Sequence, residues 1–159
     1  MNIKVLLVDD HKLMRIGLRS LIEKQSDMDV VAEAQDGREA IAMSAQLKPD
    51  VVIMDIGMPD LDGIEATRQI LAEHPTARII ALSMHSDRRF VSGMLEAGAL
   101  GYLLKDCAFE ELIHAIKTIM NNQTYLSPDI TGVVIQDYIR QLSAEETSAF
   151  GVLTARERE

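Results

Sequence analysis

Five short apolar runs alternate along the chain with stretches that have the spacing of amphipathic helices. The apolar runs occupy residues 3–8, 30–34, 51–54, 78–84 and 101–105, and the helical stretches occupy residues 12–24, 38–47, 63–73, 88–97 and 109–120. Strands that alternate with helices build β-α-β units, which form a parallel sheet covered on both faces. Because the crossovers are right-handed, few topologies remain. We therefore predict an α/β fold, a flavodoxin-like doubly wound five-stranded parallel sheet with strand order 2-1-3-4-5 and helices on both faces.

Residues that start and stop helices support these boundaries. Asp62 is placed as an N-cap of the third helix, and Gly98 is placed as a C-cap of the fourth. Pro49 and Pro75 follow the second and third helices, as expected of residues that cannot continue them. The first strand is not followed by a G-x-G-x-x-G sequence, which weighs against a dinucleotide-binding variant of this fold.

Composition narrows the class of protein. A chain of 159 residues suits one domain of ordinary size with an extension, and it contains no apolar run long enough for a membrane span. The formal net charge of -9 argues against direct binding of nucleic acid by this chain, and we interpret the Arg88-Arg89 pair as a solvated helix start. Cys107 is the single cysteine, which favours a reducing, cytoplasmic location.

The chain changes character after residue 122. Residues 121–129 form a turn-rich connector, residues 129–142 have the apolar spacing of one more helix, and residues 143–151 are polar and predict a flexible linker. Whether that helix packs on the domain or on a second chain is left open by the pattern.

Carboxylates follow two strands that are neighbours in the predicted sheet. Asp9 and Asp10 end the first strand, and Asp55 ends the third. Two unit charges about 4 Å apart repel by about 4 kcal/mol at an effective dielectric constant of about 20, so such a cluster requires a compensating charge. Mg²⁺, a hard cation that binds a few carboxylates and waters, meets that requirement. Alternatively, each acid serves only as a cap of a helix or turn.

Two further polar side chains end the remaining strands. Ser83 follows the fourth apolar run and Lys105 follows the fifth. A hydroxyl and an ammonium opposite a metal-bound carboxylate are suited to hold the oxygens of a phosphoryl group. Each has a plainer interpretation, Ser83 as a turn residue and Lys105 as a solvated lysine.

The motifs VLLVDDH, VVIMDIGMPDLDG, IIALSMH and AGALGYLLKD resemble, in order and spacing, the signatures of two-component response-regulator receiver domains. The resemblance covers residues 3–121. It implies that Asp55 accepts a phosphoryl group from a histidine kinase, so that the chain is a switch and not an enzyme acting on other substrates. It further implies Mg²⁺ bound by Asp10, by Asp55, by the backbone carbonyl of Gly57 and, through water, by Asp9. Ser83 and Lys105 are then expected to contact the phosphoryl oxygens.

The same resemblance assigns switching and tuning residues. Tyr102 falls at the position of the aromatic switch residue, with Ser83 as its partner, although a half-buried tyrosine with its hydroxyl in water is the alternative. His85 is a possible tuning residue for hydrolysis, or a surface histidine with no role. Pro59 and Gly63 are expected to shape the loop after Asp55. His11 is expected at the start of the first helix.

The terminal LTARERE resembles the opening of the LuxR-type helix-turn-helix domain in the NarL/FixJ class of transcription regulators. We therefore expect a receiver domain over residues 1–122, a linker with one helix over residues 123–152, and the start of a truncated DNA-binding domain over residues 153–159. A regulator of this class is expected to dimerise when phosphorylated and to bind DNA only through the missing domain, with no membrane association. Asp106 stands where many receivers have proline, which leaves open whether the Lys105–Asp106 peptide bond is cis.

Three other functions compete, of which direct DNA binding by this chain is disfavoured by its charge and by the expected truncation. A haloacid-dehalogenase-like phosphatase also uses an aspartate nucleophile and Mg²⁺, but it requires a second aspartate two residues on, where this chain has Gly57. A receiver-like interaction module that is not phosphorylated would show degraded acids or lack the lysine.

Overall fold

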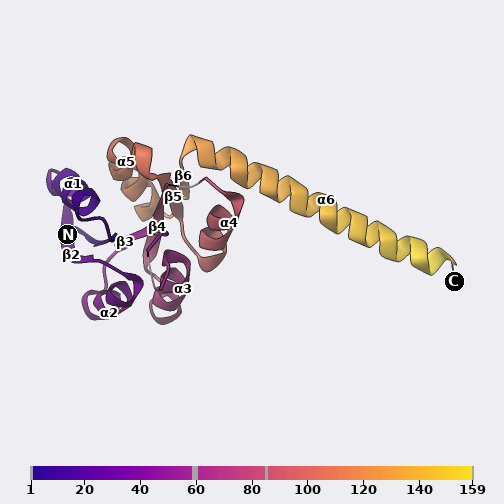
Figure 1. Cartoon of the computed structure of the whole chain (residues 1–159), viewed down its shortest axis with the longest axis horizontal. Helices are drawn as coiled ribbons and strands as arrows, with labels where there is room; N and C mark the ends of the chain where they lie inside the picture. The colour runs from indigo at the N-terminus through magenta and orange to yellow at the C-terminus, as the bar shows by residue number, and fades with distance from the viewer. Residues whose placement is uncertain (1, 59–60, 85, 159) are drawn as a thin grey trace.

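The computed structural model, which describes residues 2–58, 61–84 and 86–158, is built on a parallel sheet (Figure 1). The strand order is β2-β1-β3-β4-β5-β6, and every pairing is parallel. The strands are β1 (Ile3–Val8), β2 (Met28–Ala34), β3 (Val51–Asp55), β4 (Arg78–Ser83), β5 (Gly101–Leu104) and β6 (Tyr125–Leu126). The predicted order of the first five is confirmed. The sixth strand was missed, because two residues inside a turn-rich connector show no strand periodicity.

Helices cover both faces of the sheet. The helices of the domain are α1 (Lys12–Glu23), α2 (Gly37–Leu47), α3 (Gly63–Glu73), α4 (Arg88–Ala97) and α5 (Ala108–Met120). Alternate strand residues point to opposite faces, so the core has two halves. One half lies under α2, α3 and α4, and the other lies under α1 and α5.

Local signals set most helix ends as expected. The Asp62 side chain accepts a hydrogen bond from the Glu65 N–H, and Gly98 ends α4 with φ of 110°, in the left-handed region. Asp36 caps α2 in the same way, and Asp87 caps α4 by accepting from the Arg89 N–H, two residues on. Lys105 begins a short 3-10 helix, η1 (Lys105–Cys107), and does not extend β5. The described residues contain no cis peptide bond, so the Lys105–Asp106 bond is trans.

The last helix, α6 (Pro128–Arg158), leaves the domain and extends away from it (Figure 1). Its first turn is anchored by Ile130, which is fully buried, and by Val133 and Val134, which pack against the core. The helix runs well past residue 142, where the sequence predicted its end, and through residues 143–151, where it predicted a flexible linker. That segment contains no proline and is rich in Ala and Glu, so its composition does not break a helix already begun.

Along the described part of the chain, no helix has both the length and the apolar content needed to cross a bilayer.

Candidate functional site

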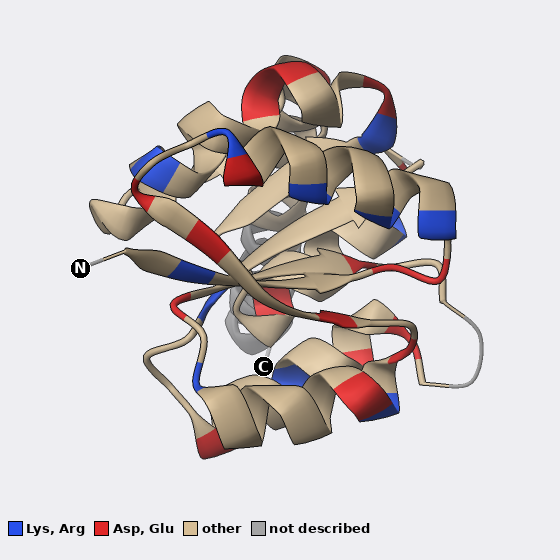
Figure 2. Cartoon of the chain, turned by 90° about the vertical axis from the view of Figure 1, so that its left-hand side faces the viewer, with Lys and Arg blue, Asp and Glu red and all other residues tan. Residues whose placement is uncertain are grey.

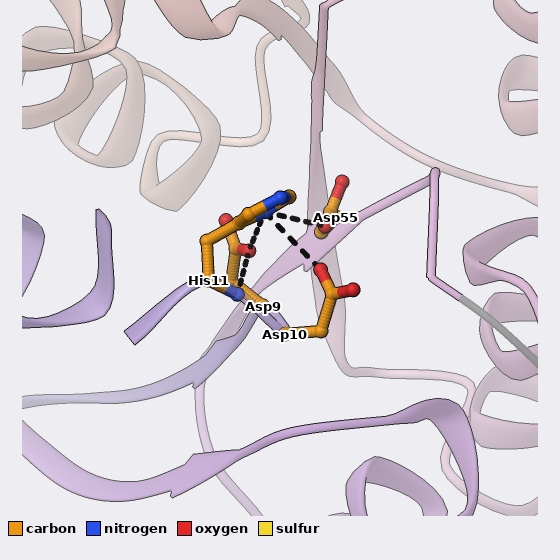
Figure 3. A group of neighbouring side chains, drawn as sticks. All are labelled: Asp9, Asp10, His11 and Asp55. Atoms are coloured by element: carbon orange, nitrogen blue, oxygen red, sulfur yellow. Dashed lines mark hydrogen bonds and ion pairs between the residues drawn. The ribbon is translucent and has the colours of Figure 1, made fainter. Parts of the chain in front are cut away.

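Parallel pairing of β1 with β3 brings the three carboxylates together. Val8 lies opposite Met54, so the residues that follow, Asp9 and Asp55, leave the sheet side by side. Ligand atoms of Asp9, Asp10, His11 and Asp55 all lie within 4.8 Å of one another (Figure 3). Asp9 and Asp55 are 1% and 2% exposed, whereas Asp10 is exposed. The alternative that each acid serves only as a cap of a helix or turn at the surface does not fit Asp9 and Asp55, because both are buried.

Lys105 supplies the positive charge that this cluster requires. Its Nζ lies 3.1 Å from Asp9 Oδ2 and 3.2 Å from Asp55 Oδ2, and the residue is 6% exposed. The side chain is therefore not the solvated lysine of the plainer interpretation. An ammonium between two buried carboxylates lowers their mutual repulsion, although desolvation offsets much of the gain.

Burial and charge oppose one another at Asp55. Burial, with the nearby Asp9 charge, raises the pKa of Asp55 to about 6, while Lys105 and the Gly57 N–H act to lower it. Gly57 donates that hydrogen bond to Asp55 Oδ1 over 3.1 Å. The carboxyl is thus ionised at neutral pH. Because burial and the Asp9 charge disfavour this ionised form, an additional cation nearby would stabilise it.

Two carboxylate oxygens remain available to such a cation. Asp9 Oδ2 and Asp55 Oδ2 are buried and have no hydrogen-bond partner among the described residues. Both lie within ion-pair distance of Lys105 Nζ, but the geometry is not that of a hydrogen bond. Hard, buried carboxylate oxygens of this kind fit Mg²⁺, which also keeps several waters.

A small pocket opens onto Asp55. It has a volume of about 120 Å³ and is lined by His11, Asp55, Gly57, Ser83, Met84 and Lys105. Ser83 and Lys105, from the ends of β4 and β5, thus face the same space as Asp55. The carbonyl of Gly57 as a metal ligand stays a prediction, since the structure shows only its N–H bound to Asp55.

Tyr102 is fully buried, on the α4 side of the sheet. Burial raises the pKa of Tyr102, and a hydrogen bond with Ser83 partly offsets the increase. The alternative of a half-buried tyrosine with its hydroxyl in water is therefore wrong. Ser83 lines the pocket at Asp55 and is also hydrogen-bonded to the phenol of Tyr102.

Sequence reasoning missed the position of one site residue, His11. It precedes α1 as expected, but its ring Nδ1 lies 2.9 Å from Asp9 Oδ1 and 3.2 Å from Asp10 Oδ1. The signal was present in the run Asp9-Asp10-His11, whose third residue turns back over the first two (Figure 3).

Arg15 supports the loop that carries the acids. Its guanidinium donates to the backbone carbonyl of Asp9 and pairs with Glu33 at 3.2 Å. One turn along α1, Arg19 pairs with the same Glu33 at 2.6 Å. The two arginines, four residues apart on one face of α1, thus both pair with a side chain of β2.

Gly63 has a different role from the turn that the sequence suggested. A Cβ at Gly63 would overlap the carbonyl oxygen of Asp55 and lie 2.9 Å from Ile56 Cα. The glycine therefore lets the start of α3 approach the backbone of the phosphoacceptor candidate. Pro59 and His85, to which the sequence assigned a loop role and a tuning role, lie outside the described residues.

Charge on the molecule is mixed. Acidic and basic segments are interspersed on the side shown in Figure 2, and no continuous basic stripe crosses that view. The formal net charge of the whole chain is -9.

Comparison with known proteins identifies the family. Residues 5–117 match the family described as response regulator receiver domain. The transcriptional regulatory protein LiaR of Bacillus subtilis is 40% identical over 157 residues, 99% of this chain and 74% of LiaR. The transcriptional regulatory protein DegU of Brevibacillus brevis is 35% identical over 145 residues, 91% of this chain and 61% of DegU. The chain thus spans about three fifths of DegU and three quarters of LiaR.

Solved structures of response regulators also superpose on this chain. A two-component response regulator of the LuxR family from Aurantimonas sp. SI85-9A1 superposes with a TM-score of 0.82 at 39% identity, covering 87% of this chain and 99% of that one. The isolated receiver domain of RcsB from Salmonella enterica, with a phosphomimetic, superposes with a TM-score of 0.77 at 26% identity, covering 84% and 99% of the two chains. On the match of residues 5–117 and the likeness to whole regulators, the chain belongs to the response regulator receiver family of two-component systems.

Proposed function

We propose that Asp55 is the phosphoacceptor of this receiver and takes a phosphoryl group from a phosphohistidine of its cognate kinase. The observation that carries the proposal is the placement of Asp55 at the end of a central strand, buried beside Lys105 and at the mouth of a small pocket. Members of the family act as phosphoacceptor switches, and Asp55 is the one carboxylate among the described residues that line the pocket.

The transfer is a displacement at phosphorus. An Asp55 carboxylate oxygen attacks the phosphorus, the phosphorus–nitrogen bond of the phosphohistidine breaks, and its electron pair leaves with the imidazole. Lys105 neutralises charge on the transferred oxygens, and the Ser83 hydroxyl donates to one of them. The Gly57 N–H holds the attacking carboxylate in place.

Mg²⁺ is the cofactor that these donors fit. Asp10 and Asp55 would hold it directly, the Gly57 carbonyl would complete the protein ligands, and Asp9 would act through water. When bound, the cation supplies charge neutralisation for the transferred oxygens.

Switching would pass through Ser83 and Tyr102 to the end of the domain. The Tyr102 carbonyl accepts a hydrogen bond of 3.0 Å from the Ser127 N–H, immediately before α6. A phosphoryl group that draws Ser83 away from Tyr102 therefore acts on the residue that is bonded to the root of α6. We propose that the outcome is homodimerisation, with DNA bound through a C-terminal domain of the LuxR type.

Intact mass after treatment with acetyl phosphate and Mg²⁺ tests the assignment. We expect one phosphoryl adduct on the wild type, and none on Asp55→Asn or without Mg²⁺. Asp29→Asn, an exposed aspartate on β2, is the matched control and should label as the wild type does. If the wild type fails to label under conditions in which an established receiver labels, the chain is an interaction module that is not phosphorylated.

A further inference from the structure

His11 lies where a cation ligand would lie, and the hydrogen bonds of its ring nitrogen are to Asp9 and Lys105, both members of the same cluster. It occupies the N-cap position of α1, but its side chain makes no capping hydrogen bond to a described helix amide. The ring instead turns over the three carboxylates (Figure 3). Its backbone N–H, which does bond to Asp9 Oδ1 at 2.8 Å, does not depend on the side chain.

The distances around the ring nitrogen match those between ligands of one ion. Nδ1 lies 2.9 Å from Asp9 Oδ1, 3.2 Å from Asp10 Oδ1 and 4.0 Å from Asp55 Oδ2. In an octahedral site with bonds of about 2.1 Å, neighbouring ligands are about 3.0 Å apart and opposite ligands about 4.2 Å apart. Of the two carboxylates proposed to bind the ion directly, Asp10 lies at the separation of a neighbouring ligand and Asp55 is close to that of an opposite ligand. The contact with Asp9 is a hydrogen bond of the ring.

Two further observations point to a ligand at this place. Asp9 Oδ2 and Asp55 Oδ2 are buried without a hydrogen-bond partner in the described structure, so the cluster has unused acceptors. Lys105 Nζ lies 3.3 Å from Nδ1, and an ammonium can only donate. In the tautomer that accepts from Lys105, the single Nδ1 lone pair points into the cluster, and a cation that displaces the ammonium would take it.

We propose that the His11 imidazole is a ligand of this cation site, which therefore takes first-row divalent transition-metal ions such as Co²⁺ and Zn²⁺ through a mixed nitrogen and oxygen set. Carboxylates alone favour Mg²⁺, whereas imidazole favours the later transition metals. The His11 side chain is 66% exposed, so it can reach an ion without a change in the core. This inference rests on the cation site of the proposed function, but not on the transfer of a phosphoryl group.

Proton NMR of the whole chain with Co²⁺ gives a direct readout. An imidazole bound to Co²⁺ gives strongly shifted ring proton signals, which we expect for the wild type and for His74→Gln but not for His11→Gln. His74 is the matched control because it lies at the end of α3, away from the carboxylates. Absence of shifted imidazole signals in the wild type, or their persistence in His11→Gln, would overturn the proposal.

Calorimetric titration provides the second measurement. Loss of a group that only orients a metal ligand weakens binding about 10- to 100-fold, so loss of a ligand should raise the Kd for Co²⁺ at least about tenfold. The Kd for Mg²⁺ should rise by a smaller factor, so that the preference for Co²⁺ falls. Equal factors for the two ions would contradict a ligand role. Both measurements omit the phosphoryl donor, so failure of Asp55 to label would leave their outcome intact.

Discussion

The buried carboxyl of Asp55 makes the stability of the empty site depend on pH. Its pKa is raised from 3.8 to about 6 in the folded chain, so the folded chain holds this proton to a higher pH than the unfolded chain does. The stabilisation is fully present below the unfolded pKa and is lost as the pH rises from about 4 to about 6. Asp55→Asn has no carboxyl at this position that could lose a proton. We expect its advantage in unfolding free energy over the wild type to grow between pH 4.5 and 6.5 and then to level off.

Urea denaturation with a chelator present measures this difference, in which the other titrating groups largely cancel. An advantage that is constant over the same interval would show that Asp55 has an ordinary pKa.

A bound cation should offset the loss of stability that accompanies ionisation of Asp55. An ion that binds only the folded chain stabilises it by about 2.7 kcal/mol when its concentration is 100 times Kd. We expect Mg²⁺ to raise the unfolding free energy of the wild type by about this amount at pH 7 and to raise that of Asp55→Asn by less. Equal stabilisation of the two proteins would place the ion elsewhere.

Replacing Lys105 is expected to lower the unfolding free energy, because two buried carboxylates then lose their counter-charge. Lys105→Met keeps much of the side-chain volume but leaves two buried carboxylates unpaired, and breaking a buried ion pair costs about 3 kcal/mol. In an Asp55→Asn background only one of the two partners remains charged. The same substitution should therefore cost less, and a double-mutant cycle measures the difference. Equal costs in the two backgrounds would show that Lys105 stabilises by packing alone.

At the scale of elements, alanine substitutions at two helical glycines should have opposite effects, because close packing matters at one and helix propensity at the other. At Gly63 a Cβ would meet backbone atoms of Asp55 and Ile56, whereas at Gly132 in α6 it would meet no described atom within 4 Å. We expect Gly63→Ala to lower the unfolding free energy by about 1–3 kcal/mol, as overpacking does. Gly132→Ala should raise it by up to about 1 kcal/mol, as a better helix former. Thermal or urea denaturation compares the two, and a stabilising Gly63→Ala would contradict the close approach.

The elements that the sequence predicted well are those with strong periodicity or explicit end signals. Strand order and the ends of α3 and α4 followed from apolar runs, from Asp62 and from Gly98. The convergence of Asp9 and Asp55 followed from parallel pairing. β6 was missed because two residues carry no period, and the length of α6 because a polar segment can extend a helix as well as form a linker.

The sequence could not predict the placement of side chains that depends on tertiary contacts. His11 turning over the carboxylates, Arg15 reaching the Asp9 carbonyl and Gly63 lying against Asp55 are each contacts between groups whose orientation only the fold fixes.

At the scale of the molecule, α6 is joined to the domain at points close to Tyr102. Tyr102 pairs with Leu126 in the sheet, and its carbonyl accepts from the Ser127 N–H. Further along, Asp137 of α6 accepts a hydrogen bond of 2.9 Å from Ser92 of α4 and lies 3.5 Å from Arg88. If Tyr102 or α4 is displaced on phosphorylation, we therefore expect the part of α6 up to Asp137 to move with it. The outer face of those turns exposes Ile135, Tyr138, Ile139 and Leu142.

Removing the hydroxyl of Tyr102 tests whether this connection carries the signal. Tyr102→Phe keeps the buried ring but loses the hydrogen bond with Ser83, whereas Tyr102→Ala also opens a cavity. We expect the phosphorylated wild type to form dimers, seen by light scattering after size-exclusion chromatography. Tyr102→Ala should label equally on Asp55 yet remain monomeric, and Tyr102→Phe should dimerise more weakly than the wild type. If both variants label and dimerise as the wild type does, Tyr102 is only a core residue, and the signal must leave the site through another element.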